Sequence, residues 1–106
     1  MTGPGSVTYE VTATLADAET AGRFPVWMER HHIPAVLATG CFESAELARL
    51  DPLTFRTRYV SRTRADLDRY LTSHTAALRA DFAREFGDHA TTSRQVWEVV
   101  TVADSR

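Results

Sequence analysis

Two segments near the ends of the chain have the hydrophobic pattern of strands. Residues 7–15 alternate apolar and polar side chains over nine positions, which is the period of a half-buried strand. Residues 90–102 contain Trp97 and a group of valines, which favour β structure. The sequence therefore predicts a strand at the start of the chain and another near its end.

The middle of the chain predicts a hairpin. Two extended runs, 41–50 and 53–62, are joined by Asp51-Pro52, a dipeptide typical of turns. In the second run alternate side chains share one face: Phe55, Thr57 and Tyr59. These two runs are expected to pair as antiparallel strands.

A helical stripe follows the first strand. Asp17 can cap a helix, because its carboxylate accepts hydrogen bonds from backbone N–H groups of the first turn. Residues then recur at intervals of three and four positions on one face: Phe24, Trp27, Met28 and His31. This face is apolar except for His31, so the histidine is expected on the buried side.

Three helix-breaking residues complicate this first helix. Glycine costs about 1 kcal/mol and proline about 3 kcal/mol in a helix interior. Gly22 and Pro25 therefore predict either a kink or a regular helix that starts at Pro25. Pro34 disfavours helical geometry at Ile33 and is expected to open a new turn over residues 34–38.

A second helix is predicted between the hairpin and the last strand. Thr63 and Asp66 resemble a capping box at its start, and Gly87 is a natural cap at its end. Its apolar stripe steps by three or four positions: Leu67, Tyr70, Leu71, His74, Leu78 and Phe82. This stripe, like the first, contains one histidine.

The predicted order is strand, helix, strand, strand, helix, strand. Right-handed crossovers place both helices on one face of a four-stranded antiparallel sheet, which is the α+β, ferredoxin-like βαββαβ fold. The other face of the sheet is left bare, although Trp97 gives it partly apolar cover. A second copy of the chain is the simplest cover, so we expect a homodimer formed through the sheet.

Length and composition are those of one folded domain. The chain has 106 residues, 43% of them hydrophobic and 25% charged. We expect a flexible N-terminus over 1–6, a single domain over 7–102 and a flexible C-terminus over 103–106. The sequence has neither the charged and apolar stretches of a signal peptide nor a window long and apolar enough to span a membrane, so a cytoplasmic protein without membrane contact is expected.

Charge and cysteine content narrow the chemistry. All twelve basic residues are arginine, so the protein cannot use a lysine to form a Schiff base or to bind a phosphate group. The net charge of −2 without a basic block disfavours nucleic acid as a partner. Cys41 is the sole cysteine, and His31-His32 is poor spacing for a metal. We therefore expect no metal and no cofactor.

The two histidines on the helical stripes are the first candidates for function. The predicted topology sets the helices side by side, so His31 and His74 can meet between the helices and the sheet. A histidine near its ordinary pKa of about 6.5 can move a proton at neutral pH. Either one alone is more often a core histidine than a functional one, but a histidine on both facing stripes, with His32 adjacent, makes the functional interpretation as good as the structural one.

Aromatic and arginine side chains can complete such a site. Tyr9 and Tyr59 lie on strands and can present phenolic hydroxyls, and Trp27 can floor a pocket. Arg79 and Arg94 can hold a carboxylate or enolate through paired N–H donors, or can form surface ion pairs. The candidate catalytic residues are His31, His74 and Tyr59; the candidate ligand-binding residues are Trp27, His32, Tyr9, Arg79 and Arg94.

Several short motifs carry a resemblance to a known family. They are Tyr9-Glu10-Val11, Trp27, His31-His32-Ile33-Pro34, Val36-Leu37, Arg58-Tyr59, Leu67-Asp68-Arg69-Tyr70-Leu71, His74, Leu78-Arg79, Phe86-Gly87 and Ser93-Arg94. From Val7 to about Val100 the chain resembles a family of small, functionally uncharacterised bacterial proteins of the dimeric α+β-barrel superfamily. Gly22 and Pro25 depart from the continuous helix expected in such relatives.

The resemblance implies a homodimer with facing sheets and a cavity in each subunit between sheet and helices. The wider superfamily includes cofactor-free monooxygenases, dye-type peroxidases, and isomerases or cyclases, but a shared fold does not transfer a function. Two functions remain open, and the sequence leaves undecided whether the protein is an enzyme. One is a small-molecule site that uses histidine for cofactor-free oxygenation or isomerisation. The other is a non-catalytic dimerising module that binds a protein or metabolite, which a closed core without voids would favour.

Overall fold

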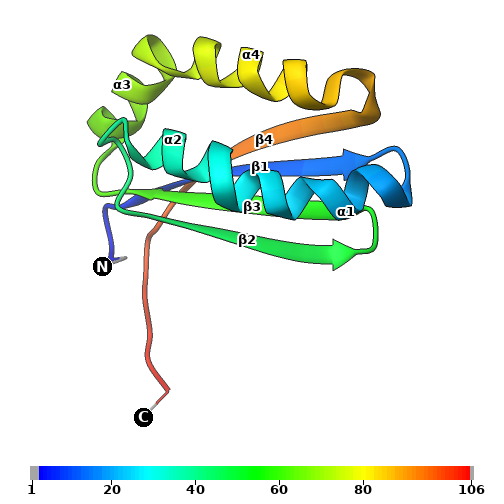
Figure 1. Ribbon diagram of the computed structural model, residues 1–106. Coiled ribbons are helices and arrows are strands. Elements are labelled where there is room, and N and C mark those ends of the chain that lie inside the picture. Colours follow the sequence, from blue (N-terminus) through cyan, green and yellow to red (C-terminus); the bar gives the residue numbers. More distant parts are fainter. Residues whose placement is uncertain (1–2, 106) are drawn as a thin grey trace.

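The computed structural model describes residues 3–105 and has two layers, with helices covering one face of a sheet (Figure 1). In this part of the chain the strands are β1 (Val7–Leu15), β2 (Ser44–Asp51), β3 (Thr54–Ser61) and β4 (Ala90–Glu98). They form one antiparallel sheet in the order β2-β3-β1-β4. The predicted ferredoxin-like βαββαβ fold is confirmed.

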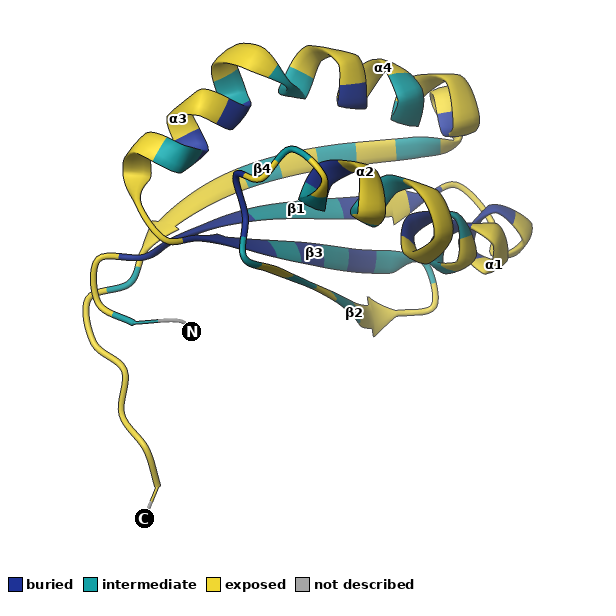
Figure 2. Cartoon of the chain, turned by 60° about the vertical axis from the view of Figure 1, so that its left-hand side comes forward, coloured by how far each residue is buried: buried dark blue, intermediate teal, exposed yellow. Residues whose placement is uncertain are grey.

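The helical layer is built from two continuous runs. The first consists of α1 (Ala18–Trp27), the π-helical turn η1 (Met28–His32) and α2 (Ile33–Leu37). The second consists of α3 (Arg64–Ser73), α4 (Thr75–Phe86) and the 3₁₀ turn η2 (Gly87–His89). Both runs lie on the same side of the sheet, and their buried residues face it (Figure 2).

Side-chain caps start the helices where the sequence predicts. The Asp17 carboxylate accepts hydrogen bonds from the backbone N–H and the hydroxyl of Thr20, both at 2.8 Å. The Thr63 hydroxyl accepts one from the Asp66 N–H at 3.2 Å. Gly87 ends α4 with a φ of 52°, a conformation that glycine adopts without strain.

The first helical run differs from the prediction at Pro34. Ile33 is helical, with φ −59° and ψ −46°, so no break precedes the proline. Proline lacks an N–H, and its ring crowds the carbonyl four residues back, here that of Arg30. The wider π turn accommodates this, because the Ile33 N–H bonds to the Met28 carbonyl five residues back.

The π turn changes which histidine faces the sheet. The positions that face the sheet recur every four residues here: Met28, His32 and Val36. His31 is exposed, whereas His32 is partly buried. The expectation that His31 lies on the buried face is therefore wrong, because it assumed regular α-helical spacing across a turn that holds an extra residue.

The second helical run is divided at His74, where one helix was predicted. His74 has φ −126° and ψ −31°, outside the helical region. Its neighbours Thr72, Ser73 and Thr75 all have low helix propensity, which makes this the weakest point of the run. The half-buried His74 ring stacks against Tyr70, with centroids 6.3 Å apart.

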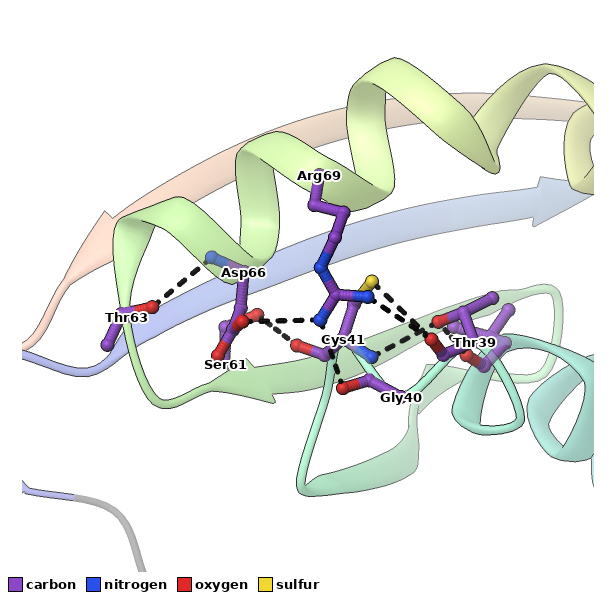
Figure 3. A network of polar contacts seen from close by, with 8 residues as sticks. Thr39, Gly40, Cys41, Ser61, Thr63, Asp66 and Arg69 are labelled. Atoms are coloured by element: carbon purple, nitrogen blue, oxygen red, sulfur yellow. Dashed lines mark hydrogen bonds and ion pairs between the residues drawn. The ribbon is translucent and has the colours of Figure 1, made fainter.

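A polar network fastens the end of α2 to α3 and β3 (Figure 3). The Arg69 guanidinium donates to the carbonyls of Thr39 and Gly40, at 3.5 and 3.4 Å, and pairs with Asp66 at 3.3 Å. The buried Ser61 hydroxyl donates to the Cys41 carbonyl at 2.9 Å. These contacts hold the two helical runs at a fixed separation at this end of the sheet.

The core consists of two apolar clusters under the helices. One surrounds Tyr9, Tyr59 and Tyr70, and the other surrounds Phe24, Phe55 and Phe86. The buried members of the tyrosine cluster are Val7, Tyr9, Val36, Cys41, Phe42, Tyr59, Leu67, Tyr70 and Leu78. Those of the phenylalanine cluster are Ala13, Leu15, Ala21, Phe24, Met28, Phe55 and Phe86. The space between the clusters is where the candidate site lies.

The last predicted strand is shorter than expected. β4 ends at Glu98, and the following segment leaves the body of the domain with Val100 and Val102 exposed (Figure 1). Of the predicted flexible termini, residues 1–2 and 106 lie outside the described residues. In the described part of the chain no helix is long and apolar enough to cross a membrane.

Candidate functional site

A small cavity lies between the sheet and the helices, where the two apolar clusters meet. It encloses about 30 Å³, which is space for about two water molecules. Its walls come from β1, β3, β4 and both helical runs: Tyr9, Val11, Ala13, Phe24, Met28, His32, Thr57, Tyr59, Tyr70, Thr75, Leu78, Arg79, Phe82, Thr92 and Arg94. We call this space the inner cavity.

The strand register brings the polar groups of the sheet together. Tyr59 on β3 is the cross-strand partner of Tyr9. Val11 has Thr57 as its partner on β3 and Arg94 as its partner on β4. Cross-strand partners point to the same face of a sheet, so these side chains all face the helices.

Four polar atoms at the cavity are buried and have no hydrogen-bond partner within the described protein. They are Nδ1 of His32, the hydroxyl of Tyr59, Oγ1 of Thr75 and Nε of Arg94. A buried polar group left unpaired costs about 1–3 kcal/mol, and native proteins leave few of them. Four such groups around one cavity make it a candidate site for a polar ligand.

The pKa of His32 is lowered to about 4. Burial disfavours the charged imidazolium, and the positive charge of Arg94 disfavours it further. His32 is therefore neutral at neutral pH and can accept a hydrogen bond or a proton through one ring nitrogen.

Two of the buried tyrosines, Tyr59 and Tyr70, remain protonated at neutral pH. Burial raises the pKa of Tyr59, and Tyr70 and Tyr9 raise it further. Burial, with a smaller effect from Tyr9, raises the pKa of Tyr70 to about 12. Both hydroxyls can therefore donate hydrogen bonds to an oxygen atom bound in the cavity.

His32 also forms part of a second, open depression between η1, α2 and α4. This outer groove has a volume of about 430 Å³ and is lined by Trp27, His31, His32, Ala35, Asp81, Arg84 and Glu85. The His32 ring stacks on Trp27 at 5.1 Å and meets the edge of Phe82 at 6.1 Å. These three rings separate the groove from the inner cavity.

The predicted site residues fall into three groups. Five line the inner cavity: Tyr9, His32, Tyr59, Arg79 and Arg94. Trp27 and His31 line the outer groove, and His74 lines neither space. His31 and His74 are thus not brought together at the inner cavity, because the π turn moves one outward and the helix break displaces the other.

Sequence reasoning missed four polar residues of the cavity wall: Thr57, Tyr70, Thr75 and Thr92. Thr57 and Thr92 share the strand face of Tyr59 and Arg94, so strand alternation could have identified them. Tyr70 belongs to the predicted apolar stripe of the second helix. Among the described residues, no group of three or more His, Cys, Asp or Glu side chains is arranged to hold a metal ion.

Solved structures with the same architecture define the class of protein. The chain is similar to SnoaB, a cofactor-independent oxygenase from Streptomyces nogalater, with a TM-score of 0.73 and 14% identity over 95% of this chain and 99% of that one. It is similar to a dimeric ferredoxin-like protein from an uncultured marine organism, with a TM-score of 0.73 and 14% identity over 92% and 98%. It is also similar to HapK from Hahella chejuensis, with a TM-score of 0.70 and 13% identity over 94% and 98%. At these identities the likeness establishes a ferredoxin-like α+β protein and no more.

The family is established by sequence. Residues 6–100 match the model of DUF4286, a domain of unknown function, and the chain belongs to this family. No curated protein matches the sequence at a significant level.

Proposed function

We propose that the inner cavity binds a small organic molecule and transfers a proton to or from it without a cofactor. The observation that carries this proposal is the convergence of unpaired, buried polar atoms from His32, Tyr59 and Arg94 on one enclosed space. Because a core selected only for stability would pair or replace these groups, their presence supports a ligand-binding role.

The chemistry follows from the charge of each group. Neutral His32 takes a proton from a C–H or O–H group of the ligand, and the electron pair of that bond stays on the ligand as an enolate or phenolate. The protonated Tyr59 hydroxyl and the Arg94 guanidinium donate hydrogen bonds to the developing oxygen anion. Return of the proton to another carbon completes an isomerisation. In the oxygenation branch O₂ is the co-substrate and oxidant: it forms a C–O bond with the anion, and the resulting peroxide takes the proton from the His32 imidazolium to give a hydroperoxide.

The size of the cavity adds a requirement. A space of about 30 Å³ admits only a small part of an organic ligand. The rest must extend past the His32 ring towards the outer groove, which is more than ten times larger. Binding therefore involves movement of the rings of His32, Trp27 and Phe82.

A thermal-shift screen of small phenols, ketones and carboxylic acids tests the proposal, because specific binding stabilises the folded state by mass action. Hits are then measured on His32→Gln and on His89→Gln, which alters an exposed histidine that lines neither space. We expect the rise in Tm to persist in His89→Gln and to be lost in His32→Gln. The proposal is wrong if no compound binds, or if both variants bind as the wild type does.

We also propose that two copies pair through the face of the sheet opposite the helices. Trp97 lies on this face and is 52% exposed. The ion pairs Glu10–Arg58 and Glu46–Arg56 balance the charges of the face, so two such faces can approach without net repulsion. The dimeric description of one structural neighbour is consistent with this arrangement.

A further inference from the structure

Two arginines that line the inner cavity, the exposed Arg79 and the partly buried Arg94, have no carboxylate partner. In the described part of the chain they form no ion pair, as is also the case for Arg30 and Arg49, whereas seven other arginines do. The cavity wall contains neither Asp nor Glu. The inner cavity is therefore lined by positive charge that the protein itself does not neutralise.

Arg94 is held in place for a ligand. Its side chain is partly buried on β4, and Nη1 donates to the Thr92 hydroxyl at 3.0 Å. This bond fixes the guanidinium plane, while Nε remains buried and unpaired. A partly buried charge without a counter-ion is unfavourable, so a bound anion would remove a cost already present in the free protein.

The two guanidinium groups act on the same part of the cavity. The charges of both Arg79 and Arg94 favour the ionised form of Tyr70, and that of Arg94 also acts on His32. Arg79 comes from α4 and Arg94 from β4, so they approach the space from the helical and sheet layers respectively. An anion near the Tyr70 hydroxyl is attracted by both.

We infer that the ligand of the inner cavity is already an anion when it binds, and that its carboxylate group lies between Arg94 and Arg79. This inference rests on the proposed function and specifies its ligand class. A carboxylate offers two oxygens to the edge of a guanidinium and accepts a further hydrogen bond from Tyr70, which leaves the Tyr59 hydroxyl for the developing oxygen anion. Its small size suits the inner cavity, and the body of the molecule extends past His32.

An anionic ligand also makes His32 a better base. In the free protein the positive charge of Arg94 helps to keep the imidazole neutral. A carboxylate beside Arg94 offsets that charge and favours the imidazolium form. The ligand thus prepares the residue that takes its proton.

Matched pairs of carboxylates and amides test the inference. The probes are acetate and acetamide, propionate and propionamide, and benzoate and benzamide, titrated at equal ionic strength and followed by NMR of the full chain. The variants are Arg94→Gln, which removes the charge but retains N–H donors, and Arg64→Gln, which removes the same charge from an exposed pair on α3. We expect the wild type and Arg64→Gln to prefer carboxylates by about tenfold or more, and Arg94→Gln to lose this preference.

The outcomes separate this inference from the proposed function. If amides bind as tightly as carboxylates, and binding still depends on His32, the site exists but the anionic ligand class is wrong. If the preference for carboxylates survives Arg94→Gln, the placement of the carboxylate is wrong. If no probe binds in any pair, the inference is overturned, whereas the proposed function is judged by the phenols and ketones of the wider screen.

Discussion

The imidazole of His32 stacks on the indole of Trp27, with ring centroids 5.1 Å apart and planes 22° from parallel. The contact joins residues on either side of the change from α1 to the π turn. Together with Phe82 on α4, which also contacts the imidazole, Trp27 holds the His32 ring at the wall of the inner cavity. The proposed proton-transfer group, His32, is thus positioned by packing, without a hydrogen bond to Nδ1 in the described protein.

The proposed ligand-binding role of the Tyr59 hydroxyl predicts that this group lowers the stability of the free protein. Because this buried hydroxyl has no partner in the described protein, Tyr59→Phe should leave the free energy of unfolding unchanged or raise it by up to about 1 kcal/mol. Ser61→Ala is the matched control on the same strand, because its buried hydroxyl donates to the Cys41 carbonyl. The control should lose about 1–3 kcal/mol in urea denaturation. A large loss of stability in Tyr59→Phe would show that the hydroxyl has a structural role.

The depressed pKa of His32 predicts a loss of stability in acid. The imidazole has a pKa of about 4 when folded and about 6.5 when unfolded, so the unfolded chain binds more protons between these values. The free energy of unfolding should therefore fall as the pH drops from about 6.5 to 4, by at most about 3 kcal/mol from this group.

Urea denaturation across this pH range measures the effect. The slope of the free energy of unfolding against pH should be smaller in His32→Gln than in the wild type. Equal slopes in the two proteins would mean that His32 is not buried as a neutral group.

The outer face of the sheet predicts a concentration-dependent dimer. Trp97→Glu places a charge on that face, so it should shift the protein from dimer to monomer in sedimentation experiments at micromolar concentration. Val26→Glu is a suitable control, because Val26 is equally exposed, at 52%, and lies on α1 in the helical layer. A wild-type monomer, or a dimer unaffected by Trp97→Glu, would exclude pairing through this face.

The sheet and the cavity residues on it were predictable because strands have a simple period. Alternation from Tyr9 places Val11 and Ala13 on the same face, and antiparallel pairing adds Tyr59 and Arg94. The four-stranded order also follows from the sequence pattern and the handedness of the crossovers. These predictions depend on local geometry that the rest of the fold does not alter.

The histidines were harder to place because helical phase accumulates error. The extra residue in the π turn before Pro34 shifts the following side chains around the helix axis, so His32 takes the inward position expected for His31. The break at His74 depends on four residues of modest helix propensity and on how α4 packs, which periodicity does not reveal. The size of the inner cavity is a property of packing and has no signal in the sequence.

The most direct test of the proposed site is imidazole ¹⁵N NMR of His32, in the free protein and with a carboxylate that raises Tm. The structure predicts that free His32 titrates near pH 4, and that the bound carboxylate raises this pKa. A His32 that titrates near 6.5 in the free protein, or that does not respond to a ligand which stabilises the fold, would contradict the proposed role of the inner cavity.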